Sequence, residues 1–195
     1  MPTKNTAKSN SSNGAATTSK KETMLFKFFH DQLKDVYYAE QQLVKALEEM
    51  KKASTTEELE DAFDNHLTQT SKHISRLEKV FAMIGKTPEG KKCEAMDGLI
   101  KEANSIIKET KQGSMTRDAA LIIAAQKAEH YEIATYGGLV QLAMTLGKQN
   151  AATLLDKTLQ EEEDTDRLLT DIAEQHINIE AEAEDAPEEM EEAEV

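Results

Sequence analysis

The feature that most constrains the fold is an apolar stripe that recurs in four long segments of the chain. In each segment the apolar residues follow one another at alternating spacings of about three and four, and most of the Lys and Glu residues lie outside this stripe. Such spacing places the apolar residues on one face of an α-helix. The pattern predicts four long helices, over residues 24–52, 57–84, 119–146 and 151–173. Packing their stripes together gives a four-helix bundle.

The connections between these segments indicate how the helices are arranged. Only a few residues join the first helix to the second and the third to the fourth, which predicts two antiparallel hairpins. The hairpins are separated by residues 85–117, and a structureless loop of that length is uncommon in a compact domain. Residues 94–110 again carry apolar residues at helical spacing, so we expect a short fifth helix there. Two hairpins with one long crossover form the ferritin-like arrangement of an antiparallel four-helix bundle.

The composition agrees with an all-α fold and excludes several other classes. Aromatic residues make up 5% of the 195 residues, with eight Gly, three Pro and no Trp, whereas sandwiches and barrels need many turn-forming residues. A single cysteine, Cys93, excludes an internal disulfide framework and a cysteine-rich zinc site. The sequence has neither an apolar run long enough to span a membrane nor the apolar region of a secretory signal. We therefore expect a cytoplasmic protein without a membrane partner.

The two ends of the chain differ from the helical segments. Residues 1–23 are polar and show no periodicity, which predicts a disordered tail. Residues 179–195 form a second, acidic tail, in which nine acidic residues and no basic one lie between 180 and 195. Residues 24–178 remain as the folded bundle. The net charge of −14 argues against a nucleic-acid partner, because binding to nucleic acid depends on Lys and Arg neutralising phosphates.

The residues that interrupt the apolar stripes are the strongest indication of function. Polar side chains replace apolar ones near the middle of each long helix, at Glu40, Thr70, Glu129, Glu132, Glu162 and Asp166. In antiparallel hairpins of similar length the midpoints lie at one level, so five carboxylates are expected to converge in the core. Burying even one unpaired carboxylate costs several kcal/mol, and no Lys or Arg interrupts the stripes at that level. The pattern predicts bound cations, and carboxylates with one or two imidazoles suit iron or manganese.

The nitrogen ligands are less strongly indicated than the carboxylates. His66 and His73 lie about one turn before and after Thr70, and each is a candidate ligand. Each is also explained as a core or boundary histidine with a hydrogen-bonding partner, so both interpretations stay open. Gly137 and Gly138 inside the third helix cost about 1 kcal/mol each relative to Ala, which predicts close approach of a neighbouring helix. Tyrosines near the carboxylates are expected to form hydrogen-bonding walls: Tyr37, Tyr38, Tyr131 and Tyr136.

Several stretches resemble the YciE/YciF-type ferritin-like stress proteins, part of the wider ferritin and rubrerythrin-like group. The stretches are DVYYAEQQL (35–43), KKCEAMDGLI (91–100), DAALIIAAQKAEHYEIATY (118–136) and LQEEEDTD (159–166). The resemblance covers about 24–178, and the third of these motifs is the most specific. It implies a di-iron or di-manganese carboxylate centre, a link to general stress and peroxide tolerance, and a homodimer.

The resemblance also implies a ligand pattern. Members of the group place Glu on the first helix, Glu-x-x-His on the second, Glu-x-x-Glu on the third and Glu-x-x-His on the fourth. Glu40, Glu129, Glu132 and Glu162 match this pattern, and His73 matches the second-helix histidine. Thr70 stands where the second-helix carboxylate is expected, and Thr165 where the fourth-helix histidine is expected. The departures leave two interpretations: one tight and one weak metal, or substitution by His66. Asp166 is the nearest residue to Thr165 that could act as a ligand.

Two functional hypotheses follow. The first is a stress protein with a dinuclear iron or manganese centre, about two ions per chain, held by Glu40, Glu129, Glu132 and Glu162. His66, His73 and Asp166 are the weaker candidates for this site. Such a centre would oxidise Fe(II) or reduce peroxide or oxygen, as a ferroxidase, peroxidase or catalase does. The alternative is a metal-free structural or interaction bundle whose acidic tail recruits a partner.

Overall fold

The computed structural model describes residues 22–184, which form helices joined by turns and one longer connection. Its elements are α1 (Met24–Ala53), α2 (Glu57–Met83), α3 (Glu94–Glu109), α4 (Met115–Thr145), α5 (Gln149–Ile172), a π-helical turn (Ala173–Ile177) and α6 (Asn178–Glu182). No strand occurs within residues 22–184, and the predicted all-α class is confirmed. Most of each predicted tail, residues 1–21 and 185–195, lies outside the described residues.

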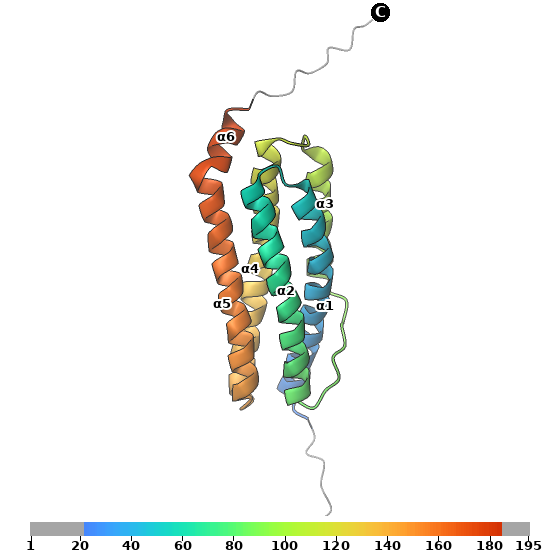
Figure 1. Cartoon of the computed structure of the whole chain (residues 1–195). Coiled ribbons are helices and arrows are strands. Elements are labelled where there is room, and N and C mark those ends of the chain that lie inside the picture. Colours follow the sequence, from blue (N-terminus) through green and yellow to red (C-terminus); the bar gives the residue numbers. More distant parts are fainter. Residues whose placement is uncertain (1–21, 185–195) are drawn as a thin grey trace, which may run out of the picture.

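The four long helices α1, α2, α4 and α5 form an antiparallel bundle with one long crossover (Figure 1). The hairpin α1–α2 packs beside the hairpin α4–α5, with α2 against α5 and α1 against α4. The crossover 84–93 runs back along the bundle and leads into α3, which packs on α1 and α4. This is the predicted ferritin-like arrangement, including the short fifth helix.

The helix ends follow from local residue chemistry. Thr23, Thr56 and Ser114 each accept a hydrogen bond from a backbone N–H in the first turn of the helix that they precede. Gly85 and Gly147 follow the ends of α2 and α4 with φ of 72° and 68°, a left-handed conformation that favours glycine. These side-chain caps and glycine stops explain where the helices begin and end. α4 begins at Met115, four residues before the predicted start, because Ser114 caps it.

The apolar core is divided into two clusters, one toward each end of the bundle. One cluster includes Leu33, Leu77 and Tyr136, and the other includes Leu47 and Leu169. The polar interruptions of the stripes lie between the two clusters, in the middle of the bundle. The helices therefore do not depend on the polar layer for their packing, because each end has its own apolar core.

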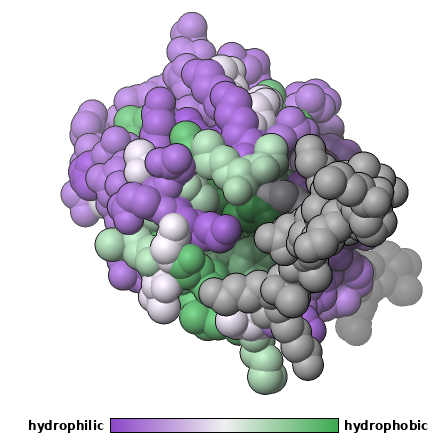
Figure 2. All heavy atoms as spheres, turned by 90° about the horizontal axis from the view of Figure 1, so that it is seen from below, coloured by the Kyte–Doolittle hydropathy of each residue, from purple (hydrophilic) through white to green (hydrophobic). Residues whose placement is uncertain are grey.

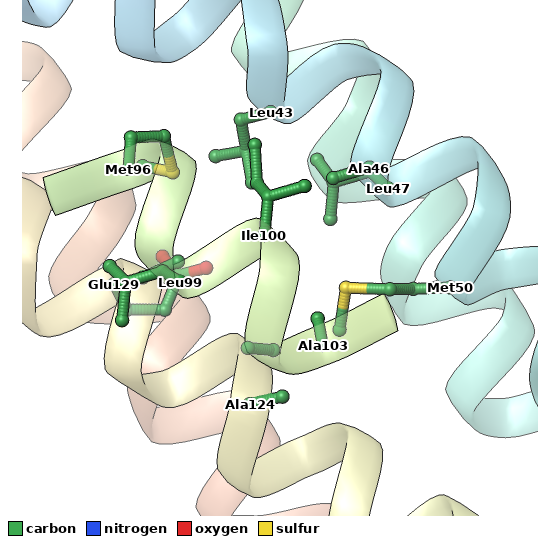
Figure 3. A pocket seen from close by; sticks show the side chains of 12 residues that line it. Leu43, Ala46, Leu47, Met50, Met96, Leu99, Ile100, Ala103, Ala124 and Glu129 are labelled. Carbon is green, nitrogen blue, oxygen red and sulfur yellow. The ribbon is translucent and has the colours of Figure 1, made fainter. Parts of the chain in front are cut away.

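The crossover helix α3 packs its apolar face over the groove between α1 and α4. Met96 and Ala103 are its fully buried residues. The side chains of Met96 and Ile100 face Leu43 of α1, and Ala103 lies near Met50 of α1 (Figure 3). The helix thus covers one side of the bundle next to the polar layer.

The C-terminal end extends the helical body beyond the predicted boundary at residue 178. After the π-helical turn, α6 continues to Glu182, and Ile177 is completely buried. The Glu184 carboxylate accepts hydrogen bonds from the backbone N–H groups of Met115 (2.6 Å) and Thr116 (3.0 Å). Glu184 therefore caps the positive N-terminal end of α4, a contact that the acidic composition of this segment does not reveal.

The end of the bundle where α1 begins carries exposed apolar residues. Within residues 22–184, no helix combines the length and the apolarity that crossing a bilayer requires. Seen from the end where α1 begins, apolar atoms gather near the middle of the molecule, within a hydrophilic rim (Figure 2). Met24, Met83 and Met144 are large hydrophobic residues exposed at this end.

The expectation for the two glycines within α4 is wrong. A Cβ atom added to Gly137 or Gly138 would meet no heavy atom of another element within 4 Å. No neighbouring helix approaches closely at this point, and nothing in the structure explains the pair.

Candidate metal centre

Six ionisable side chains from all four long helices meet in the middle of the core. α1 contributes one of them, α2 two, α4 two and α5 one, and all six are buried: Glu40, His66, His73, Glu129, Glu132 and Glu162. Each side chain occupies an inward position of its helix, between the two apolar clusters. We call these six residues the central cluster.

The central cluster forms two groups that share one residue. In the first group, His66, Glu129, Glu132 and Glu162 each offer a ligand atom, and these atoms lie within 4.8 Å of one another. In the second group, one ligand atom each from Glu40, His73 and Glu162 also lies within 4.8 Å of the other two. Two adjacent sets of donors with a shared carboxylate are the arrangement found around pairs of metal ions in helical bundles.

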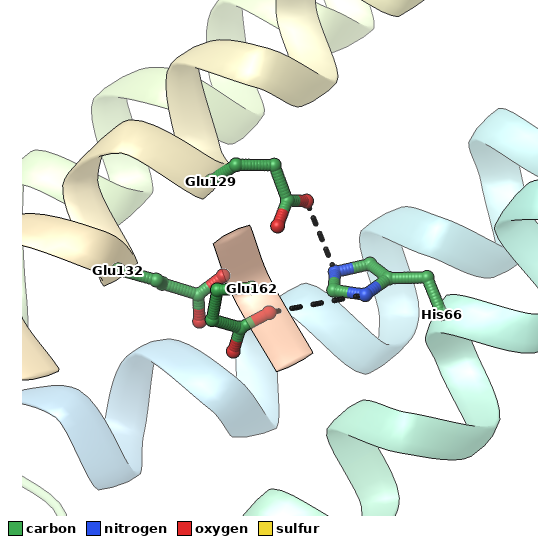
Figure 4. Close-up of side chains that lie close together, drawn as sticks. All are labelled: His66, Glu129, Glu132 and Glu162. Atoms are coloured by element: carbon green, nitrogen blue, oxygen red, sulfur yellow. Dashed lines mark ion pairs between the residues drawn. The ribbon is translucent and has the colours of Figure 1, made fainter. Parts of the chain in front are cut away.

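The first group converges on the imidazole of His66 (Figure 4). His66 Nε2 lies 3.1 Å from Glu129 Oε1, and Nδ1 of the same ring lies 4.0 Å from Glu162 Oε2. The carboxylate of Glu132 faces the same space from α4 (Figure 4). The imidazole therefore has a carboxylate near each of its two nitrogen atoms.

The second group is built around His73, whose ring is held from outside the cluster. His73 Nδ1 lies 3.0 Å from Glu162 Oε1 and 3.5 Å from Glu40 Oε1. On the other side of the ring, His73 Nε2 lies 2.9 Å from Glu161 Oε2. With the proton of neutral His73 on Nε2 and donated to Glu161, the lone pair of Nδ1 points into the cluster.

Arg76 and Tyr136 support this second group. The Arg76 guanidinium donates to both carboxylate oxygens of Glu161, at 3.0 and 3.2 Å, and so holds the carboxylate against His73. The hydroxyl of Tyr136 donates to Glu40 Oε1. Arg76 lies one turn beyond His73 and pairs with Glu161, so it does not neutralise the carboxylates of the central cluster.

Most of the polar atoms in the central cluster have no hydrogen-bond partner. Ten buried side-chain nitrogen and oxygen atoms in the described part of the chain lack one, and nine of them belong to the central cluster. Both carboxylate oxygens of Glu132 and both of Glu162 are among these nine. Buried polar groups are nearly always satisfied in native proteins, so this concentration of unsatisfied atoms fits donors arranged around cations.

Without a cation, the cluster can reduce its charge only by taking up protons. Burial disfavours the charged form of His66, but the nearby Glu129 carboxylate outweighs this effect and raises the pKa of His66 to about 9. Burial similarly opposes protonation of His73, whereas the adjacent carboxylates of Glu162 and Glu40 raise its pKa to about 10. Burial raises the pKa of Glu162 to about 7, and burial together with neighbouring carboxylates raises that of Glu132 well above its ordinary value. Metal ions would compete with these protons for the same atoms.

The donor set fits two divalent cations. With both imidazoles neutral, four carboxylates carry four negative charges, which two divalent ions balance. Carboxylate oxygens with imidazole nitrogens suit iron and manganese, and the absence of a thiolate from either group disfavours softer metals.

Comparison with known proteins places the chain in a family. The family model described as "Domain of unknown function (DUF892)" matches residues 24–182. The chain belongs to the DUF892 family. Protein YciF of Escherichia coli (strain K12) is 48% identical to this DUF892 protein over 151 residues, which are 77% of this chain and 90% of YciF.

Two solved structures resemble this DUF892 protein. The crystal structure of the E. coli stress protein YciF matches with a TM-score of 0.76 at 45% identity and covers 80% of this chain and 99% of its own. YcfI of Rhodopseudomonas palustris, provisionally assigned as a structural protein, matches with a TM-score of 0.73 at 38% identity, covering 78% of this chain and 96% of its own. The resemblance to YciF-type stress proteins that the sequence motifs indicated is confirmed.

The DUF892 fold brings together most of the predicted ligands, but not Asp166. Six of the seven candidates form the central cluster, whereas the Asp166 carboxylate lies outside both groups. Asp166 Oδ1 instead accepts a hydrogen bond from Gln126 Nε2 (3.2 Å) and lies 3.4 Å from His130 Nε2, where 23% of its side chain is exposed. A step of four residues from Glu162 turns the helix by about 40° beyond a full revolution, which directs Asp166 toward the surface.

The two threonine departures have different local roles. Thr70 is buried and donates to the carbonyl oxygen of His66 within its own helix. Thr165 donates to the carbonyl oxygen of Glu161 (3.0 Å) and contacts the Gln69 side chain (3.3 Å). Neither joins a candidate group, and His66 supplies α2's donor to the first group.

Sequence reasoning missed the supporting residues Glu161 and Arg76. Glu161 is one of three consecutive glutamates, and only Glu162 continues the apolar stripe of its helix. Arg76 follows His73 by three residues, which places it on the same helix face. That spacing was the available signal for a basic residue near the predicted site.

Proposed function

We propose that this DUF892 protein binds a dinuclear iron or manganese centre in the central cluster and uses it in oxidative stress. The observation that carries the proposal is the concentration of nine unsatisfied buried atoms in two groups that share Glu162. Glu40 and His73 would hold one ion, and His66, Glu129 and Glu132 the other. The Glu162 carboxylate would serve both.

A pair of iron or manganese ions supplies reversible one-electron chemistry, and carboxylate-rich ligation favours the higher oxidation state. Around it, the residues of this chain position donors and exclude water. Glu161 keeps a proton on Nε2 of His73 and thereby directs Nδ1 inward. The Tyr136 hydroxyl holds Glu40 by a hydrogen bond and closes the cluster toward the adjoining apolar core.

The proposed activity is oxidation of Fe(II) or reduction of peroxide or oxygen. Support comes from the donor chemistry and from the relative E. coli YciF, which is described as a stress protein. A cytoplasmic location and a homodimer belong to the same proposal. The oxidant that the loaded centre consumes and the reductant that it oxidises together decide whether the protein acts as a ferroxidase, a peroxidase or a catalase.

Metal content tests the proposal directly. The metal-free protein is reconstituted with Fe(II) or Mn(II), and bound metal is measured by elemental analysis. We expect about two ions per chain, and a loss of at least one in Glu162→Gln. Glu163→Gln is the matched control, because Glu163 is the next residue, belongs to neither candidate group, and accepts a hydrogen bond from the exposed side chain of Gln160. A folded wild-type protein that binds no iron or manganese would refute the proposal.

The alternative is a structural or interaction bundle without a metal. Two observations favour it: each end of the bundle has its own apolar core, and the relative YcfI is provisionally assigned as a structural protein. This alternative predicts that the metal-free protein and Glu162→Gln are folded and that added metal changes the stability of neither. Under the metal-centre proposal, metal raises the melting temperature of wild type more than that of Glu162→Gln.

A further inference from the structure

An apolar cavity adjoins the central cluster on the side covered by the crossover helix. It lies between α1, α3 and α4, and eleven of its twelve lining residues are apolar. Leu43, Leu47 and Met50 line it from α1, Met96 and Leu99 from α3, and several small alanines from α4 (Figure 3). The free space has room for little more than one water-sized molecule.

The single polar residue of the cavity wall belongs to the central cluster. Glu129 lines the cavity and also contributes its carboxylate to the first candidate group. Its Oε2 atom is buried without a hydrogen-bond partner. The cavity therefore reaches the proposed metal ligands from the side, without passing through a polar channel.

The outer end of the cavity is formed by α3. Leu99 and Ile100 line the cavity and are only half-buried, whereas Met96 in the preceding turn is completely buried. These two are the only lining residues that are not buried, so they mark the side from which a small molecule can enter. No charged side chain besides Glu129 lines the cavity.

The chemistry of the lining selects the class of ligand. Water and hydrogen peroxide both carry O–H groups, and Glu129 is the one polar residue in the wall that could accept from them, so burying their remaining polar groups there costs free energy. A cavity lined by apolar side chains tends to stay dry and to accept apolar guests. Dioxygen is small, uncharged and apolar, and it dissolves better in apolar media than in water. We propose that this cavity binds dioxygen and delivers it to the central cluster, an inference that rests on the proposed metal centre for its delivery step.

The first test asks whether dioxygen occupies the cavity of the metal-free protein. Methyl-labelled leucine gives matched probes, because Leu43 and Leu47 line the cavity while Leu77 and Leu155 are equally buried in the opposite cluster. Dioxygen is paramagnetic, so under oxygen pressure we expect severalfold larger relaxation enhancement at the methyl groups of the cavity pair. Equal enhancement at the two pairs would overturn the proposal.

The second test fills the cavity. Ala125→Val adds two methyl groups at the cavity wall, and Ala143→Val is the matched control in the same helix, because Ala143 is buried in the opposite cluster. We expect Ala125→Val, but not Ala143→Val, to remove the excess enhancement at Leu43 and Leu47. Circular dichroism and melting temperatures establish that both variants fold. Leu99→Ala, at a half-buried position, is expected to leave the excess enhancement in place or to increase it; losing it would contradict the inferred entry path.

The third test measures delivery in the iron-loaded protein. Two ferrous ions each give one electron to dioxygen, which takes up two protons and becomes hydrogen peroxide; with peroxide as oxidant, the same electrons and protons yield two water molecules. We expect Ala125→Val to slow oxidation by dioxygen severalfold and to leave oxidation by peroxide unchanged. Equal slowing of both reactions, or of neither, would overturn delivery through the cavity.

These outcomes separate the two proposals. If wild type binds no iron while the cavity leucines show the excess enhancement, the metal centre fails and the dioxygen site stands without its delivery role. If iron binds and is oxidised while the leucine pairs respond equally, the metal centre stands and the dioxygen site fails.

Discussion

Replacing Glu161 by glutamine tests how the central cluster is held in place. Glu161 belongs to neither candidate group and reaches the cluster only through His73 Nε2, at 2.9 Å. Its two carboxylate oxygens also receive the guanidinium of Arg76, at 3.0 and 3.2 Å. Glutamine keeps the size of the side chain but offers one acceptor oxygen and no charge. It therefore cannot satisfy His73 and both nitrogen atoms of Arg76 together.

The expected loss of metal affinity follows from this geometry. A carboxylate that accepts from a metal-bound histidine raises the basicity of the ring and fixes its orientation, and its loss typically costs about 10–100-fold in metal affinity. This range corresponds to about 1.4–2.7 kcal/mol. The effect is expected on the ion that we propose for Glu40 and His73, because the first group does not include His73. The metal-free protein is expected to lose about 1–3 kcal/mol of stability, because Arg76 is nearly buried and its ion pair with Glu161 is only partly exposed.

Competition with a chromophoric chelator measures the two metal affinities, and urea unfolding of the metal-free protein measures stability. Glu163→Gln serves as the control, since it removes a neighbouring charge without touching the cluster. In Glu161→Gln we expect one ion to bind with lower affinity than in wild type and the other to bind with unchanged affinity. If both affinities equal those of wild type while stability falls, Glu161 and Arg76 form a structural ion pair and the inferred orientation of His73 is wrong.

Three further predictions concern the fold and its protonation. Asp118 is buried and accepts hydrogen bonds from the backbone N–H groups of Thr55 (2.7 Å) and Thr56 (2.9 Å) and from the Thr56 hydroxyl (2.8 Å). Asp118→Ala is therefore expected to lower the free energy of unfolding by about 2–4 kcal/mol. A change below about 0.5 kcal/mol, the size typical of surface substitutions, would contradict this role. In the metal-free protein, the pKa is raised to about 9 for His66 and to about 10 for His73. Protonation of these residues therefore stabilises the fold fully below pH 6.5, and this contribution is lost as pH rises through 9 and 10. The melting temperature should fall over this pH range, and a rise would refute the argument. Burial raises the pKa of the Cys93 thiol, so iodoacetamide at pH 8 should alkylate it much more slowly in the native protein than in urea, and equal rates would show that the thiol is accessible.

The helices could be predicted because their signals are local. The apolar spacing lies within each segment, and Thr56, Gly85 and Gly147 mark helix ends through contacts with residues a few positions away. The roles of Asp118 and Glu184 could not be predicted in this way. Asp118 contacts a turn more than sixty positions earlier in the chain, and Glu184 caps a helix that begins almost seventy positions before it.

The candidate site likewise contains residues that could be predicted from their own helix and one, Asp166, that could not. The periodicity of each helix predicts which glutamates point inward, because these residues interrupt the apolar stripes: Glu40, Glu129, Glu132 and Glu162. Asp166 also fits the stripe in sequence, but about 40° of helical rotation separates it from Glu162 and brings it beside Gln126. Periodicity resolves which side of a helix a residue occupies, and it does not resolve rotations of this size.

The sequence by itself determined an all-α ferritin-like bundle and a layer of buried carboxylates, because helical periodicity and the cost of burying charge act within each segment. Only the tertiary structure decided how that layer is organised. His66 lies beside Glu129 and His73 beside Glu40, whereas Glu162 belongs to both groups. Glu161 lies on the far side of His73, outside the cluster. These relations depend on the rotation and axial offset of one helix against another. Side-chain packing across helices sets both quantities, and no single helix encodes them.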